Sequence, residues 1–266
     1  MEYDVCVIGL GYIGIPTATI FANIGKKVLG VDVVEQKVNM VAQGRSSIGE
    51  HEIDEMLKTV VSRGLLSTAM VPASSKAYII AVPTPFKKTK EGRKIPDMSY
   101  VESATRSIAK CIQSNQLVIL ESTSPVGTTG NMRVWLKDEL SKIGRAADVD
   151  FEKILFAHAP ERILPGQMLK ELVTNDRIVG GTTPEASNVA QKLYKEFCAG
   201  EVIITDARTA EMTKLTENAS RDVSIAFANE LSIVCDKLGI DVWELIRLAN
   251  RHPRVKVLNP GPGVGG

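Results

Sequence analysis

The chain has 266 residues, enough for one large or two modest domains that fold without disulfide or metal support. Its 32 basic and 31 acidic residues leave a formal charge of +1, which argues against a broad nucleic-acid-binding surface or a polybasic membrane segment. Hydrophobic residues make up 44% of the sequence and charged residues 24%, values that exclude disorder or a coiled coil along the whole chain.

The remaining composition favours a soluble cytoplasmic protein. Glu2 and Asp4 occupy positions where a secretory signal carries Lys or Arg. No apolar run approaches the ~18 residues of a membrane span. The cysteines are far apart, without the spacing of a zinc site, so we predict no metal and a reducing compartment. They are Cys6, Cys111, Cys198 and Cys235.

Short apolar runs alternate with amphipathic stretches along the first two-thirds of the chain, as in β-α-β units. Strands are predicted at residues 3–8, 27–32, 77–82, 117–121, 154–158, 177–179 and 201–205. Helices are predicted at residues 13–24, 52–63, 99–112, 128–143 and 184–197. Continuous apolar runs indicate strands covered on both faces. The sequence therefore predicts an α/β fold with a doubly wound, Rossmann-like parallel sheet.

The pattern changes after residue 205. From 206 to 238 neither Pro nor Gly interrupts a helical pattern, and Gly239 ends it. A second helix is predicted at 242–250, followed by a tail at 259–266 that is rich in Pro and Gly. We therefore expect a first domain over 1–206 and a long-helix domain over 207–266.

A glycine-rich turn joins the first predicted strand to the first predicted helix. Gly9 permits a tight turn, Gly11 lets backbone approach a diphosphate, and Gly14 allows close helix packing. Asp32 ends the next strand, where a carboxylate accepts hydrogen bonds from a ribose diol and repels a 2′-phosphate. NAD is therefore expected rather than NADP, although Lys37 weakens that preference. The alternative is a glycine-rich turn that binds nothing.

Three further segments place polar residues after predicted strands, at the sheet edge where α/β proteins bind ligands. They are residues 82–85, 121–129 and 159–166. The long helix adds Lys214, Asn218 and Arg221, whose spacing places them on one face. A cation and an amide together can hold an oxyanion, whereas the alternative is a solvated polar stripe.

Seven sequence segments in this order resemble the UDP-glucose/GDP-mannose dehydrogenase family along the whole chain. They are GLGYIG, VPTP, STSPVGTT, APERILPG, KLTEN, AFANE and HPRV…NPGPGVGG. PERILPG and the last segment resemble the branch that oxidises UDP-N-acetyl-D-mannosamine. In the UDP-glucose branch a second glutamate stands where this chain has Pro165.

The resemblance implies an NAD-dependent, four-electron oxidation of a UDP-N-acetylhexosamine at C6 to the uronic acid, for surface polysaccharide or glycan synthesis. Lys214 would be the acid/base and Asn218 its partner at the oxyanion, and Glu161 and Thr123 would position or activate the hydrolytic water. The cofactor contacts implied are Gly9, Gly11, Tyr12, Ile13, Gly14, Asp32, Lys37, Thr84 and Thr123. The substrate contacts implied are Glu161, Arg162, Ile163, Lys214, Asn218, Arg221, His252, Arg254 and Gly265.

The resemblance also implies a homodimer or larger homo-oligomer built on the long helix. The family's nucleophilic cysteine and its C-terminal UDP-binding domain come after the segment at which this sequence stops. We therefore expect residues 1–266 to bind NAD without forming a uronic acid, which the full-length parent would form.

Other functions remain open from the residues. UDP-N-acetylglucosamine or UDP-glucose is an alternative substrate. A β-hydroxyacid dehydrogenase also joins a dinucleotide domain to a long helix that carries Lys and Asn, although the 121–129 segment and the tail disfavour it. A non-catalytic nucleotide-binding or dimerisation module is the alternative outside enzymes.

Overall fold

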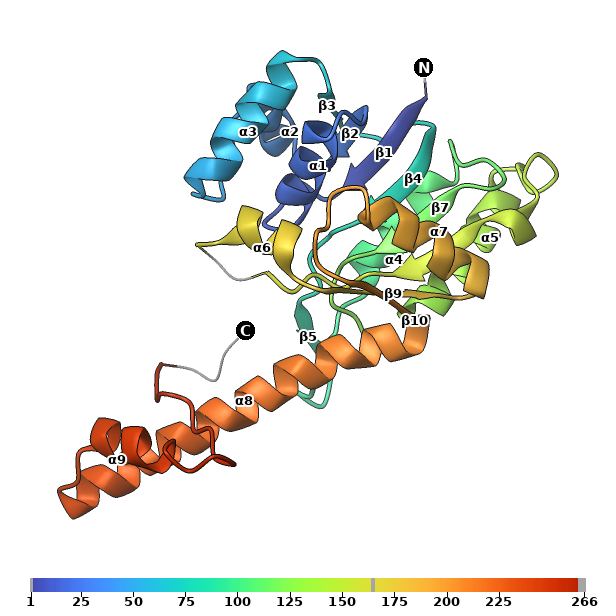
Figure 1. Cartoon of the computed structure of the whole chain (residues 1–266). Coiled ribbons are helices and arrows are strands. Elements are labelled where there is room, and N and C mark those ends of the chain that lie inside the picture. Colours follow the sequence, from blue (N-terminus) through green and yellow to red (C-terminus); the bar gives the residue numbers. More distant parts are fainter. Residues whose placement is uncertain (1, 164–165, 263–266) are drawn as a thin grey trace. The chain divides into compact units, whose positions relative to one another are not determined.

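The structure is a computed structural model that describes residues 2–163 and 166–262 (Figure 1). It divides into two compact units, Met1–Met212 and Thr213–Gly266. The division falls inside the long helix α8 (Ala207–Leu238).

An eight-stranded sheet forms the centre of the first unit, in the order β10-β9-β8-β7-β4-β1-β2-β3. The strands are β1 (Tyr3–Ile8), β2 (Val28–Val31), β3 (Leu66–Ala69), β4 (Ser75–Ile80), β7 (Leu117–Leu120), β8 (Leu155–His158), β9 (Arg177–Gly181) and β10 (Val202–Asp206). The predicted doubly wound sheet is confirmed, with its order reversing between β1 and β4. It is not wholly parallel, because β9 pairs antiparallel with β8 and carries β10 in its own direction.

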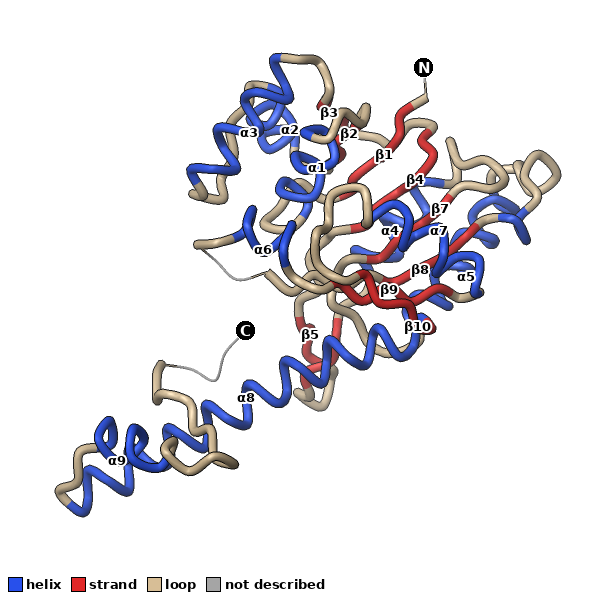
Figure 2. Tube along the Cα trace, in the orientation of Figure 1, coloured by secondary structure: helices blue, strands red, loops and turns tan. Residues whose placement is uncertain are grey.

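Helices cover both faces of the sheet (Figure 2). One face packs against α1 (Gly14–Asn23), α2 (Glu35–Ala42), α3 (His51–Ser62), α6 (Met168–Thr174) and α7 (Pro184–Tyr194). The other packs against α4 (Ser99–Ile108) and α5 (Thr128–Lys142). Each predicted strand and helix is present. The helix predicted over 99–112 ends at Ile108, so Cys111 lies in a turn.

Several short elements were not predicted. They are α2, β3, α6, the antiparallel hairpin β5 (Phe86–Lys88) and β6 (Lys94–Pro96), and a 3-10 turn at Phe151–Lys153. Each is eight residues or shorter, too short for a hydrophobic period to emerge from the sequence.

The second unit consists of the rest of α8, the helix α9 (Val242–Ala249) and the chain that follows it. Asp241 caps α9 by accepting a hydrogen bond from the amide of Trp243 at 2.8 Å. Asn229 on α8 accepts one from the amide of Gly261 at 2.9 Å, which holds the tail against the helix. Within the described residues, no helix combines the length and the apolar character needed to cross a bilayer.

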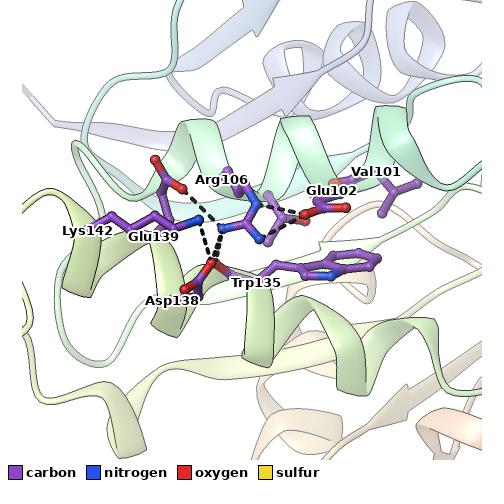
Figure 3. Close-up of polar contacts among 8 residues, drawn as sticks. Val101, Glu102, Arg106, Trp135, Asp138, Glu139 and Lys142 are labelled. Atoms are coloured by element: carbon purple, nitrogen blue, oxygen red, sulfur yellow. Dashed lines mark hydrogen bonds and ion pairs between the residues drawn. The ribbon is translucent and has the colours of Figure 1, made fainter.

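A cluster of charged side chains joins α4 to α5 at the surface (Figure 3). Arg106 donates to Glu102 at 2.9 Å, to Asp138 at 2.7 Å and to Glu139 at 3.1 Å. Because these groups are partly exposed, the cluster contributes little to stability beyond fixing the two helices together.

A second set of charges is buried between the sheet, α1 and α7. Glu121, at the end of β7, accepts hydrogen bonds from the hydroxyls of Thr17 at 2.9 Å and Tyr194 at 2.7 Å. Arg177 opens β9, with one guanidinium nitrogen 3.9 Å from the Glu121 carboxylate and the other 2.9 Å from Glu161. Two buried carboxylates therefore share one buried cation, and the group carries a net negative charge when both are ionised.

Burial raises the pKa of Glu121 to about 7 and the charge of Glu161 adds to the rise, against the opposing effects of Arg177, Tyr194 and Thr17. When a carboxyl has a higher pKa in the folded than in the unfolded chain, the folded state loses stability as the pH rises from the unfolded pKa to the folded pKa. From the ordinary value near 4.5 to about 7, ionisation of Glu121 therefore opposes folding.

We predict that Glu121→Gln removes this pH dependence. Between pH 5 and 8 the free energy of unfolding of the wild type should fall relative to the variant by on the order of 2–3 kcal/mol. Urea unfolding at the two pH values measures the difference. Tyr194→Phe is the control, because it keeps the titrating carboxyl and deletes a hydrogen bond that lowers the pKa of Glu121, so its free energy of unfolding should still fall between pH 5 and 8, by at least as much as in the wild type. A difference between Glu121→Gln and wild type that does not vary with pH contradicts the prediction.

Candidate functional site

The carboxyl ends of five strands meet at one edge of the sheet. Backbone hydrogen bonds join each strand end to the next: Gly9 N to Val31 O at 2.7 Å, Ala81 N to Ile8 O at 2.8 Å, Glu121 N to Ile80 O at 2.9 Å and Ala159 N to Leu120 O at 3.0 Å. The glycine turn and the segments 82–85, 121–129 and 159–166 therefore follow one another along this edge, as the sequence predicts.

The glycine turn lies against the end of β4. Gly9 has a φ of +104°, and a Cβ there would lie 2.5 Å from the carbonyl oxygen of Ala81. A Cβ at Gly14 would lie 1.7 Å from the carbonyl oxygen of Gly9. Neither position tolerates a side chain, so the turn and the start of α1 depend on both glycines.

Gly11 has the opposite environment. A Cβ at Gly11 would have no atom within 4 Å among the described residues, so the space beside this residue is open. In the part of the chain that the structure describes, no side chain caps the N-terminus of α1. An open approach to an uncapped helix N-terminus suits the diphosphate of a dinucleotide.

Asp32 fixes the glycine turn. Its side chain is 8% exposed. One carboxylate oxygen accepts from the amide of Leu10 at 2.8 Å and the other from the amide of Val34 at 2.9 Å. Lys37 stands 3.6 Å from the first oxygen. Asp32 therefore joins β2 to the glycine turn and to the start of α2, a role that the sequence did not reveal, and each oxygen keeps a lone pair for a ligand.

The other expected cofactor residues lie in this turn or in two loops along the same edge of the sheet. Tyr12 lies exposed in the turn, and Ile13 is the N-cap residue of α1. Thr84 and Thr123 are half-buried in the loops that follow β4 and β7. The hydroxyl of Ser122 donates to the carbonyl of Val82 at 2.7 Å, which holds these two loops together.

Glu161 is buried and held on both carboxylate oxygens. Oε1 accepts from the amides of Arg162 at 2.7 Å and Ile163 at 3.1 Å, and Oε2 accepts from Arg177 at 2.9 Å. Glu161 therefore forms an ion pair with Arg177, which the sequence did not indicate. The Arg162 guanidinium donates to the carbonyl of Asp176 at 3.1 Å.

Glu211, which the sequence analysis missed, holds the loop that carries Thr123. This carboxylate lies on the first turns of α8 and is fully buried. It accepts from the amides of Gly127 at 2.5 Å and Thr129 at 2.8 Å, and from the Thr129 hydroxyl at 2.6 Å. Glu211 thereby caps the N-terminus of α5 in place of an anion.

The remaining expected residues belong to the second unit. Lys214, Asn218 and Arg221 all lie on α8, with Lys214 half-buried and the other two exposed. His252 and Arg254 are exposed after α9, where the ring of His252 accepts from the amide of Arg254 at 3.3 Å. Gly265 and Pro165 lie outside the described residues.

None of the four cysteines has the environment of a nucleophile. Cys6 is buried in β1, and burial raises the pKa of its thiol to about 12. Burial also raises the pKa of Cys111, while Cys198 and Cys235 are buried. A thiol with a raised pKa carries almost no thiolate at neutral pH.

Comparisons with known proteins agree with this geometry. Residues 3–198 match the NAD binding domain of the UDP-glucose/GDP-mannose dehydrogenase family, and residues 208–266 match its central domain. The UDP-N-acetyl-D-mannosamine dehydrogenase of Campylobacter jejuni is 55% identical over 98% of this chain and 64% of its own length.

Two other proteins show the same relationship. The NDP-N-acetyl-D-galactosaminuronic acid dehydrogenase of Ralstonia nicotianae is 52% identical over 98% of this chain and 61% of its own length. A solved structure of a UDP-N-acetyl-D-mannosamine dehydrogenase from Pyrococcus horikoshii is 44% identical, with a TM-score of 0.89 over 100% of this chain and 61% of the other. The chain thus spans about three-fifths of the length of these relatives. It belongs to the UDP-glucose/GDP-mannose dehydrogenase family, and residues 3–198 form its NAD-binding domain.

Proposed function

We propose that the protein oxidises C6 of UDP-N-acetyl-D-mannosamine to a carboxylate and reduces two NAD per sugar. The observation that carries this proposal is the sheet edge, where an open glycine turn, Asp32, Thr123 and Glu161 come together within a chain of this family. N-acetylated sugars stand in the names of the relatives from Campylobacter and Ralstonia, which supports that substrate class. The free cysteines support a reducing compartment such as the cytoplasm.

The residues take the following roles in the proposal. The backbone at Gly11 and the N-terminus of α1 hold the diphosphate, and Asp32 accepts hydrogen bonds from the ribose. When bound, NAD accepts a hydride from C6 in each oxidation. Lys214 takes the proton of the C6 alcohol, and Asn218 donates a hydrogen bond to the developing oxyanion.

The first oxidation leaves an aldehyde at C6, which in this proposal a cysteine thiolate captures, as the resemblance to the family implies. Loss of a second hydride to NAD gives a thioester, and water hydrolyses it to the carboxylate and the free thiol. Glu161 and Thr123 are the groups that position this water, since both follow strands at the sheet edge. In this proposal the nucleotide sugar is contacted by six further residues, Arg162, Ile163, Arg221, His252, Arg254 and Gly265.

We predict that Asp32→Asn weakens NAD binding by about 1–3 kcal/mol, because the ribose loses charge-assisted hydrogen bonds. Isothermal titration calorimetry on residues 1–266 measures the affinity. Asp4→Asn is the matched control, since Asp4 also accepts from a backbone amide, that of Lys27 at 2.9 Å, and pairs with a lysine, Lys76 at 2.8 Å. Equal NAD affinity in Asp32→Asn and wild type contradicts the assignment.

We predict that the complete gene product forms two NADH per UDP-N-acetylmannosamine and that residues 1–266 alone form no acid. The expectation that residues 1–266 form no acid rests on the environments of the cysteines, because none of the four thiols is suited to capture an aldehyde. UDP-N-acetylglucosamine, UDP-glucose and a β-hydroxyacid are the competing substrates. Faster turnover of any of these shows that the substrate is misassigned. Sustained acid formation by residues 1–266 shows that one of the four cysteines is reactive.

We also propose that the second unit forms a homodimer through α8 and α9. Large apolar side chains are exposed along both helices, among them Val223 at 70%, Leu238 at 66%, Trp243 at 57%, Phe227 at 55% and Leu248 at 55%. Isolated exposed apolar residues are ordinary, but this many on one pair of helices indicates a covered surface.

Light scattering should return twice the chain mass of 28.8 kDa at micromolar concentrations. Phe227→Asp should shift the protein to the monomer, with its helical circular dichroism retained. A wild-type monomer across that concentration range contradicts the dimer.

A further inference from the structure

The reversed direction of β9 brings Arg177 to the sheet edge where Glu161 lies. In the antiparallel pair, Ala157 is opposite Gly181 and His158 is opposite Gly180. Continued by three residues, this register sets Glu161 opposite Arg177, and their side chains meet at 2.9 Å. A parallel β9 would begin at the other edge of the sheet. The departure from a wholly parallel sheet therefore supplies the cation for Glu161.

The guanidinium of Arg177 is confined on all the sides that the structure describes. It stacks 4.8 Å from the ring centre of Tyr194 and 5.6 Å from that of Phe197, and the residue is 4% exposed. Glu121 lies 3.9 Å from Nη1, and its own carboxylate is fixed by Tyr194 and by Thr17 of α1. A guanidinium held by stacking and charge directs its N–H groups along fixed lines.

This confinement determines the orientation of Glu161. The two amides on Oε1 belong to the residues directly after Glu161, so they move with it and cannot orient it against the sheet. Among the described contacts of the carboxylate, Arg177 provides the link to a separate strand. Removing that link frees the side chain to rotate, and rotation of the carboxylate weakens its hydrogen bonds to the two amides.

We propose that Arg177 is a positioning residue that orients the Glu161 carboxylate, with Glu121 and Thr17 connecting Arg177 to the cofactor helix α1. The consequence for catalysis rests on the proposed function, in which Glu161 positions the water. The orientation itself does not depend on that function and is testable in residues 1–266.

The amide signals of Arg162 and Ile163 test the orientation by NMR, because hydrogen bonding to a carboxylate shifts an amide proton downfield. In Arg177→Lys both signals should move upfield toward their positions in Glu161→Gln. Arg177→Met/Glu121→Gln is the second variant, since it removes a cation and its neighbouring anion together and so avoids an uncompensated buried charge. Arg106→Lys is the control, because Arg106 also has carboxylate partners, three of them, but lies on the other face of the sheet. This change should leave the amide signals of Arg162 and Ile163 unmoved. Unchanged signals in both Arg177 variants overturn the proposal.

Kinetics of the complete gene product test the consequence. Arg177→Lys should lower kcat about tenfold or more and leave the KM for NAD within about twofold, as expected for a misplaced catalytic group. Adding Arg177→Lys to Glu161→Gln should cause no further loss, because Arg177 acts through that carboxylate. Additive losses show that Arg177 acts other than through Glu161 and overturn the kinetic part. If wild-type enzyme reduces no NAD with any UDP-sugar, the proposed function fails, and the NMR result alone decides the positioning.

Discussion

The contact between the glycine turn and the end of β4 is the constraint on which the site depends. Gly9 and Gly14 leave no room for a Cβ, so the strand end, the turn and the first turn of α1 form one close-packed backbone unit. Asp32 locks this unit to β2 through the amide of Leu10. Of the three glycines of this turn, only Gly11 would give a Cβ no neighbour within 4 Å among the described residues, and it lies just before the N-terminus of α1. The end of β1 therefore presents backbone donors beside open space, which suits a diphosphate.

The buried charges around Arg177 are costly for a fold to maintain. An apolar cluster of the same volume would often be as stable or more stable, so a buried ion network is weak evidence for stability. Its location is informative instead, because it connects the cofactor helix at Thr17, the end of β7 at Glu121 and the loop after β8 at Glu161. The network thereby fixes the positions of these three elements relative to one another.

The alternating strands and helices and the edge of the sheet could be predicted from the sequence, because apolar runs and glycine spacing are local signals. The sequence analysis missed what depends on long-range pairing. The direction of β9 is set by how the chain returns after α6, and no residue within 177–179 encodes it. Glu211 and Arg177 appeared as ordinary helix and strand residues, since their partners lie 82 and 16 residues away along the chain. A charged residue that opens an otherwise apolar strand was the available signal for Arg177, whereas Glu211 has exposed neighbours along α8 and no local signal marked it.

The central claim is that the glycine turn holds the diphosphate of NAD and that Asp32 holds its ribose. A crystal structure of residues 1–266 with NAD tests it most directly. We expect electron density for the diphosphate beside Gly11 at the N-terminus of α1, with the adenosine ribose hydroxyls on the Asp32 carboxylate. Density for NAD elsewhere on the chain, or a diphosphate distant from Gly11, would contradict it.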